Sequence, residues 1–198
     1  MDANRRLWWV LGVMFTVSFG ALLLIGSEIY REMPPIPETV VSEDGQVIYT
    51  RDDIQRGRQV WQTLGGQQVG SIWGHGAYVA PDWSADWLHR EAVALLDLWA
   101  QDQYGADFNA LGSEAQAGLK ARLVREMRTN SYEADSDRIV ISADRAEAMA
   151  QVHAHYRELF GNGTELESLR EQYAIANDAI PSVEHRELMP AFFFWTAW

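Results

Sequence analysis

The sequence predicts a mainly α-helical protein, in which an N-terminal transmembrane helix is followed by a helical outer domain with a few short strands. Three observations predict this fold class. An uncharged apolar run near the N-terminus is long enough to cross a bilayer. Apolar residues recur at helical spacing in several later segments, whereas patterns typical of strands are confined to two short stretches.

The N-terminal region has the properties of a membrane anchor. No charged residue lies between Leu7 and Gly26, and a helix of this length crosses the hydrocarbon core. Arg5 and Arg6 precede the run, so the positive-inside rule places the N-terminus in the cytoplasm and the rest of the chain outside. A cleaved signal peptide is the alternative, but its apolar core is usually only about 7–15 residues long. We therefore expect residues 1–32 to be a transmembrane anchor.

Residues 33–188 are expected to form the outer domain. The prolines in residues 33–40 favour an extended linker. Thr50 and Asp53 have the spacing of a capping pair at the start of a helix. The expected elements are strands at 45–50 and 138–142, helices at 53–64, 88–99, 113–127 and 143–160, and a long glycine-rich loop at 65–81.

Two of these helices allow finer predictions. The apolar spacing of the helix at 88–99 places Leu88, Leu95 and Trp99 on one inward face. Ser113 stands where it can cap the next helix through its hydroxyl group.

The C-terminal residues AFFFWTAW follow Met189 and Pro190 and are unusually apolar. They are too few to span a membrane. We expect residues 189–198 to be the start of a second transmembrane helix, at which this sequence stops. The alternative is a C-terminal segment that packs into the core of the outer domain.

Composition excludes several kinds of function. The chain has 16 Lys and Arg against 28 Asp and Glu, so its net charge of −12 disfavours nucleic-acid binding. It has no cysteine, which excludes disulfides, thiolate zinc sites and a heme attached through thioether bonds. His153 and His155 are two residues apart on an expected helix, so they point to different faces and do not share a metal. No motif of a self-contained enzyme is present, and we predict no catalytic residue.

The most unusual segment runs from Trp61 to Trp87 and is rich in tryptophan and glycine. Two interpretations are open. In the first, the tryptophans are anchors that pin an ordinary loop. In the second, the glycines let backbone carbonyls and the hydroxyl group of Tyr78 face a partner or an ion. Long loops within compact domains are usually functional.

This segment resembles the N-terminal region of single-subunit, quinol-dependent nitric oxide reductases. In the cytochrome subunit of the related cytochrome c-dependent enzymes, a G-x-x-[LV]-[WF] helix precedes the heme-attachment motif C-x-x-C-H and a G-E-G-A-Y-x-A-P-E stretch. Residues 57–61 match the helix and residues 74–82, GHGAYVAPD, match the last stretch. GGQQVG at 65–70 stands in place of C-x-x-C-H. The resemblance covers nearly the whole chain and includes MPAFFFWTAW at 189–198.

The resemblance implies a cytochrome c-like fold that has lost its covalent heme. Such a domain caps a heme-copper-oxidase-like membrane region that reduces two NO to N2O and water with electrons from quinol in denitrification. The hemes b and the non-heme iron belong to that catalytic region, which is missing from this sequence. The implied location is the bacterial inner membrane, with the domain on the periplasmic side.

The resemblance also implies one metal contact. In the cytochrome-subunit relatives, the G-A-Y stretch supplies a glycine carbonyl and the tyrosine to a calcium ion, and Gly76 and Tyr78 occupy these positions here. The remaining calcium ligands would come from the missing catalytic region. The alternative function, from a different class, is a stand-alone membrane-anchored binding or sensor module without catalysis.

Overall fold

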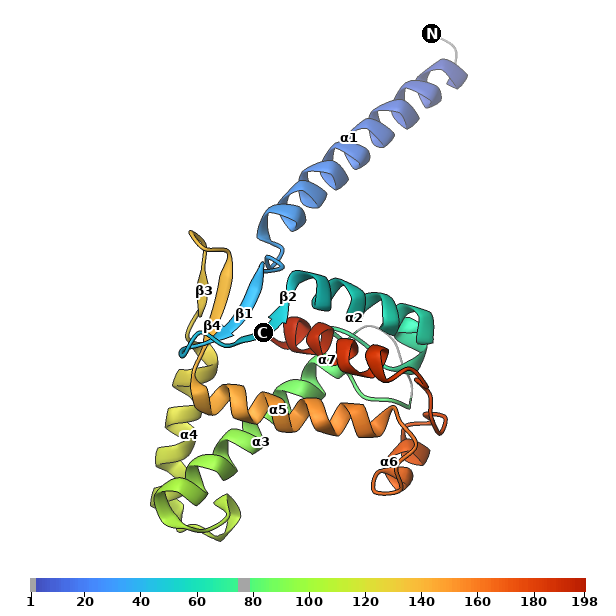
Figure 1. Ribbon diagram of the computed structural model, residues 1–198. Helices are drawn as coiled ribbons and strands as arrows, with labels where there is room; N and C mark the ends of the chain where they lie inside the picture. The colour runs from blue at the N-terminus through green and yellow to red at the C-terminus, as the bar shows by residue number, and fades with distance from the viewer. Residues whose placement is uncertain (1–2, 75–78) are drawn as a thin grey trace. The chain divides into compact units, whose positions relative to one another are not determined.

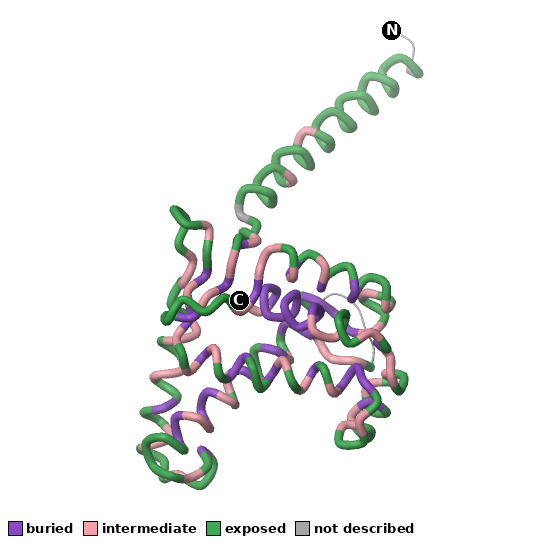
Figure 2. The backbone as a smooth tube through the Cα atoms, in the orientation of Figure 1, coloured by how far each residue is buried: buried purple, intermediate pink, exposed green. Residues whose placement is uncertain are grey.

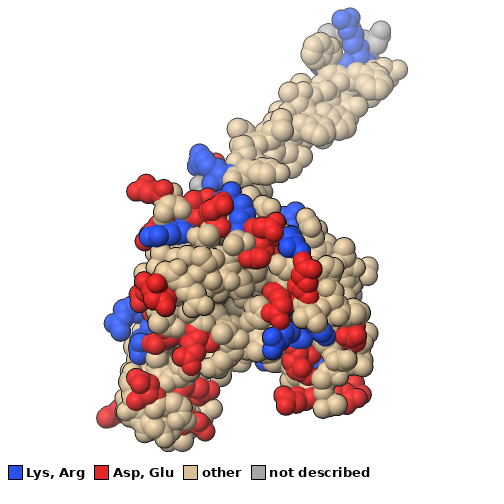
Figure 3. Space-filling view, viewed as in Figure 1, with Lys and Arg blue, Asp and Glu red and all other residues tan. Residues whose placement is uncertain are grey.

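The computed structural model describes residues 3–74 and 79–198, which fall into two compact units, Met1–Pro35 and Ile36–Trp198. The first unit is helix α1 (Ala3–Glu32), which confirms the predicted N-terminal helix. Among the described residues, its segment Asn4–Arg31 is the one helix long and apolar enough to cross a membrane. Nearly all residues of this segment are exposed (Figure 2), and the middle of the face seen in Figure 3 carries no charge. A membrane anchor and a signal sequence share these properties.

The second unit is mainly helical, with a small mixed sheet (Figure 1). Its chain order is β1 (Thr39–Ser42), β2 (Val47–Thr50), α2 (Arg51–Leu64), the 3-10 turn η1 (Gly66–Val69), α3 (Trp83–Tyr104), the 3-10 turn η2 (Phe108–Ala110), α4 (Ser113–Arg128), β3 (Tyr132–Glu133), β4 (Arg138–Ile141), α5 (Ala143–Leu159), α6 (Glu167–Gln172) and α7 (Val183–Ala197). The fold class predicted from sequence is therefore confirmed.

The described strands form one sheet in the order β2-β1-β4-β3. β1 is antiparallel to β2 and parallel to β4, and it pairs Val40 with Ile139, both fully buried. β1 lies partly within residues 33–40, which we expected to be linker. The strand is only four residues long and is stabilised by pairing with a strand far along the chain, so no local pattern reveals it.

In the second unit, α2, α3, α5 and α7 begin with a side-chain cap, whereas α4 and α6 do not. Thr50 and Asp53 form the predicted capping box at the start of α2. Ser113, in contrast, is the first residue of α4, and Gly112 before it makes no side-chain cap. The prediction that Leu88 faces inward is also wrong, because Leu88 is exposed and Trp87 and Glu91 take the buried positions of α3.

The C-terminal residues lie in the core of the second unit. They belong to α7, which begins at Val183, and residues 188–196 are all buried (Figure 2). α7 contacts α2 so closely that a Cβ atom on Gly57 would lie 2.3 Å from the carbonyl oxygen of Leu188. These residues therefore pack into the second unit, with no unit boundary near residue 189. A membrane helix that continues from this segment stays a prediction.

The two ends of the second unit lie close together around the sheet. The indole N–H of Trp198 donates to the hydroxyl oxygen of Ser131 at 3.2 Å, and its ring lies 6.2 Å from that of Tyr132 on β3. β3 is separated from β1, where the chain enters the unit, by β4 alone, so roughly 10 Å lies between those two strands. The first strand of this unit and its last residue, Trp198, therefore lie at the same end of the unit.

Candidate functional site

Residues 65–70 stand where the resemblance places the heme-attachment motif. The last of them, Gly70, packs directly on a buried tryptophan. They form the turn η1 and end at Gly70, whose φ is 139°. A Cβ atom on Gly70 would lie 1.9 Å from Nε1 of Trp83, the first residue of α3. Trp83 is fully buried, and its indole N–H has no hydrogen-bond partner among the described residues. This position therefore requires glycine both for its backbone angle and for space.

Beneath this turn, aromatic rings from three helices fill the core. The ring of Trp83 stacks on Phe193 of α7, with centroids 5.3 Å apart, and meets Phe160 edge-on at 5.4 Å. The ring of Trp87 stacks on Tyr156 of α5 at 5.7 Å. We call these five residues the aromatic core. Burial raises the pKa of Tyr156 well above its usual value, and its hydroxyl group donates to Asp86 at 2.7 Å.

The next part of the loop is closed by hydrogen bonds. The backbone N–H of Ser71 donates to the carbonyl oxygen of Pro81 at 3.1 Å, and that of Trp83 donates to the carbonyl oxygen of Ser71 at 2.8 Å. We call residues 71–74 and 81–85 the loop neck, because they join the two sides of the loop.

Asp82 is the centre of the loop neck. Its Oδ2 accepts from the hydroxyl group of Ser71 at 2.8 Å and from the backbone N–H of Gly74 at 2.5 Å. Its Oδ1 accepts from the hydroxyl group of Ser84 and from the N–H of Ala85 at 3.0 Å, which caps α3. Partial burial alone would raise the pKa of Asp82, but the donors from Ser84, Gly74, Ala85 and Ser71 lower it below its usual value.

Trp73 connects the loop neck to the C-terminal helix. Its indole N–H donates to the carbonyl oxygen of Thr196 in α7 at 2.8 Å, and its ring lies 5.8 Å from that of Trp195. Its φ is 54°, an angle that costs a non-glycine residue about 1–2 kcal/mol. Although tied in this way, Trp73 remains 53% exposed.

Gly76 and Tyr78, the predicted calcium contacts, lie outside the described residues, so this prediction is untested. The described residues contain no group of three or more His, Asp or Glu that could hold a metal ion.

A buried ion pair between α3 and α5 is a feature that sequence reasoning missed. Glu91 and Arg145 form an ion pair with side chains 1% and 5% exposed, and Glu91 also accepts from the indole N–H of Trp87 at 2.8 Å. A buried carboxylate needs such partners, because burial without them is costly. The signal in the sequence was the position of Glu91 four residues after Trp87, on the apolar face of the helix.

The histidines on α5 point to different faces, as predicted. His153 accepts or donates at both ring nitrogens, 3.1 Å from the hydroxyl oxygen of Tyr49 and 2.7 Å from Glu187. His155 lies near Arg90 on α3, and burial, helped by that positive charge, lowers its pKa to about 4.

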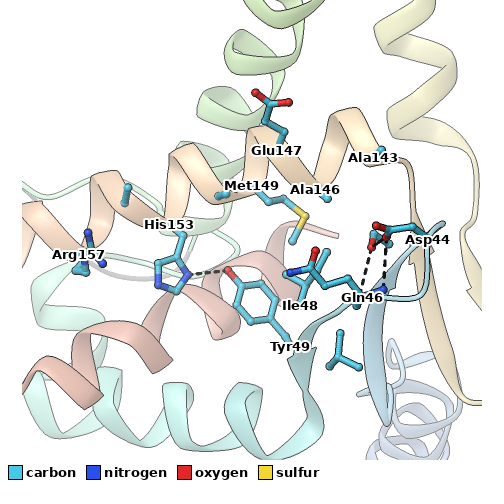
Figure 4. Close-up of a pocket in the computed structure, with 14 residues that line it drawn as sticks. Asp44, Gln46, Ile48, Tyr49, Ala143, Ala146, Glu147, Met149, His153 and Arg157 are labelled. Carbon is cyan, nitrogen blue, oxygen red and sulfur yellow. Dashed lines mark hydrogen bonds between the residues drawn. The ribbon is translucent and has the colours of Figure 1, made fainter.

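A groove of about 540 Å³ lies between β2 and α5 (Figure 4). Met149 points into it from α5, and His153 points across it toward Tyr49. The remaining walls combine short side chains such as Ala146 and Ala150 with the charged Asp44. The polar groups of His153 are already paired with protein partners, so they leave no open donor or acceptor that would define a ligand.

Comparison with known proteins identifies the second unit. The family of the cytochrome c-like domain of the nitric oxide reductase NorB matches residues 37–198. The chain belongs to this family. The match begins at the start of the second unit and includes α7, so the C-terminal apolar segment is part of the family's domain. Among curated proteins, no match is found.

The family's cytochrome c-like character raises the question of a covalent heme, and these residues do not fit one. The chain has no cysteine to form a thioether bond. Beneath residues 65–70, Gly70 lies against Trp83, and the buried rings of the aromatic core pack below this turn. These residues therefore offer no thiol that could attach a heme.

Proposed function

We propose that this chain is the N-terminal part of a membrane-bound, quinol-dependent nitric oxide reductase. The overall reaction converts two NO and one quinol into N2O, water and quinone. The observation that carries the proposal is the family match over the whole second unit in a chain without cysteine. A domain that cannot attach a c-type heme cannot relay electrons from a soluble cytochrome through one, which favours quinol as the donor.

The role of the domain in this enzyme is to cap a catalytic, heme-copper-oxidase-like membrane region. The first strand of the second unit and Trp198, its last residue, lie at one end of the unit, and this supports the role. A domain attached to the membrane region at one end can cover that region from outside. The N-terminal helix then serves as an anchor in the bacterial inner membrane, with the domain on the periplasmic side. Hemes b and non-heme iron belong to the catalytic region.

The contact with the catalytic region is proposed at Gly76 and Tyr78. A backbone carbonyl and a tyrosine oxygen suit calcium, which prefers oxygen ligands. The other ligands would come from the catalytic region, so the chain alone should bind calcium weakly. The loop neck supports this proposal, because it ties both sides of the loop to the fold.

Substitution in the complete reductase tests the proposal. The double variant Gly76→Pro and Tyr78→Phe should lose nitric oxide reduction while hemes b remain bound. Tyr104→Phe, at an exposed tyrosine at the end of α3, is the matched control and should leave activity unchanged. Unchanged activity and stability of the double variant would contradict the proposal.

The gene distinguishes the reductase from a stand-alone anchored module. A reading frame that continues past Trp198 with ten or more apolar spans, as expected for the roughly twelve-helix catalytic subunit, supports the reductase. A stop codon directly after Trp198 supports the module.

A further inference from the structure

Asp82 holds the two sides of the loop neck with different oxygens. Oδ1 bonds the returning side, Ser84 and Ala85, where the chain enters α3. Oδ2 bonds the outgoing side, Ser71 and Gly74. One carboxylate therefore links the points at which the loop leaves and rejoins the fold.

The second oxygen is not needed to start the helix. Three other helices in this chain begin with a cap that uses one hydroxyl oxygen. These caps are Thr50 at α2, Ser142 at α5 and Ser182 at α7, and each accepts from the third residue of its helix, as Asp82 does from Ala85. A serine at position 82 would therefore be sufficient for capping. The additional oxygen of the carboxylate has a different use.

That use is the hydrogen bond to Gly74. The backbone bonds between Ser71 and Pro81 and between Trp83 and Ser71 close the loop at its base. Gly74 lies further out, with φ at 76°, and its N–H is fixed by Oδ2 of Asp82. A bond from an N–H to an ionised carboxylate is roughly twice as strong as one between neutral groups.

We propose that Asp82 is the positioning residue of this loop. Its Oδ2 fixes the backbone of Gly74, two residues before Gly76 in the segment that the proposed function assigns to the contact with the catalytic region. What the loop contacts rests on the proposed function. The hydrogen bonds of the loop neck join described residues, so they can be tested without that function.

Two substitutions separate the two oxygens. Asp82→Ser keeps one capping oxygen and removes the acceptor for Gly74, whereas Asp82→Ala removes both. Amide hydrogen exchange, resolved at single residues in the full chain in mild detergent, reports each bond. In Asp82→Ser, exchange at Gly74 should accelerate about tenfold or more, with Ala85 unchanged. In Asp82→Ala, both amides should accelerate.

Matched variants complete the test. Ser182→Ala removes a cap elsewhere and should affect the amide of His185 but not that of Gly74. Asp82→Glu keeps both carboxylate oxygens and should restore most of the protection at Gly74. The inference is overturned if Gly74 stays protected in Asp82→Ser, or if Gly74 and Ala85 accelerate together in that variant.

The activity of the complete reductase distinguishes this inference from the proposed function. Asp82→Ser should lower nitric oxide reduction about tenfold with heme content unchanged, because small misplacements of an interface are costly. Asp82→Glu should restore the rate. If Gly76→Pro with Tyr78→Phe abolishes activity but Asp82→Ser does not, the positioning role alone is overturned. If neither changes the rate, the proposed function is overturned.

Discussion

Residues 65–70 and the loop neck are adjacent in the chain, and both rest on the start of α3, yet different forces hold them. The first segment is fixed by shape, because Gly70 lies against the indole ring of Trp83 and the core below is aromatic. The loop neck is fixed by hydrogen bonds that converge on one carboxylate. The first segment packs on the core through the buried Gly70, whereas the loop neck is polar and carries the half-exposed Trp73.

The difference separates scaffold from function within one glycine-rich stretch. At residues 65–70 the chain has a turn that ends in Gly70 against the ring of Trp83. In the loop neck, polar side chains fix the backbone on both sides of the loop.

The largest expected effect is at the closed side. Gly70→Ala places a Cβ atom on Nε1 of Trp83 and forces an alanine to adopt a φ of 139°. We expect the free energy of unfolding to fall by about 3–5 kcal/mol, from overpacking and backbone strain together. Thermal and denaturant unfolding of the full chain in mild detergent measures this loss.

Gly74→Ala is the matched control. Its φ is 76°, but no atom of the described residues lies within 4 Å of the added Cβ atom, so only backbone strain of about 1 kcal/mol is expected. Equal losses of unfolding free energy in Gly70→Ala and Gly74→Ala would show that the close contact with Trp83 adds no cost beyond backbone strain.

A smaller effect compares two tryptophans one turn apart. Trp83 and Trp87 are both fully buried, but among residues 3–74 and 79–198 a hydrogen-bond partner is found only for the indole N–H of Trp87, which donates to the buried Glu91. Trp83→Phe should cost about 1–2 kcal/mol for the space left by the smaller ring. Trp87→Phe should cost about 1–3 kcal/mol more, because Glu91 loses a donor.

The measurement is the difference in unfolding free energy between these two variants. Equal costs would mean that Glu91 is satisfied by Arg145 alone. A larger cost for Trp83→Phe would show that its unpaired N–H has a partner in the working protein.

The sequence predicted the features of this fold that depend on neighbours in the chain. The apolar N-terminal run, the capping pair of Thr50 and Asp53, and the helical spacing of α3 and α5 are local patterns, and each corresponds to an observed element. The glycine at position 57 also matched the family's motif, and the structure gives its physical reason, the close approach of α7.

What the sequence did not show depends on distant contacts. β1 is stabilised by β4, and the packing of the C-terminal apolar segment against α2, α3 and α5 joins residues far apart in the chain. The burial of Glu91 likewise depends on Arg145, far along the chain, together with the nearby indole of Trp87. In the candidate site, the motif indicated Gly76 and Tyr78, but the two-sided use of Asp82 follows only from geometry.

The smallest expected effect is a dependence of the loop neck on pH. Because the pKa of Asp82 is lowered in the folded chain, its charged form stabilises the fold above the usual aspartate pKa of about 4. This stabilisation is lost as the pH falls through the lowered value, where the carboxylate takes up a proton and Oδ2 ceases to accept as an anion. Wild type should exceed Asp82→Ser in unfolding free energy by about 1 kcal/mol at pH 7, and the gap should narrow as the pH falls below about 4. Taking the difference between variants removes the contribution of other carboxylates with a lowered pKa, such as Glu187. If the difference in unfolding free energy between wild type and Asp82→Ser stays constant with pH, the loop neck is stabilised by packing, as Gly70 is, and not by the charge of Asp82.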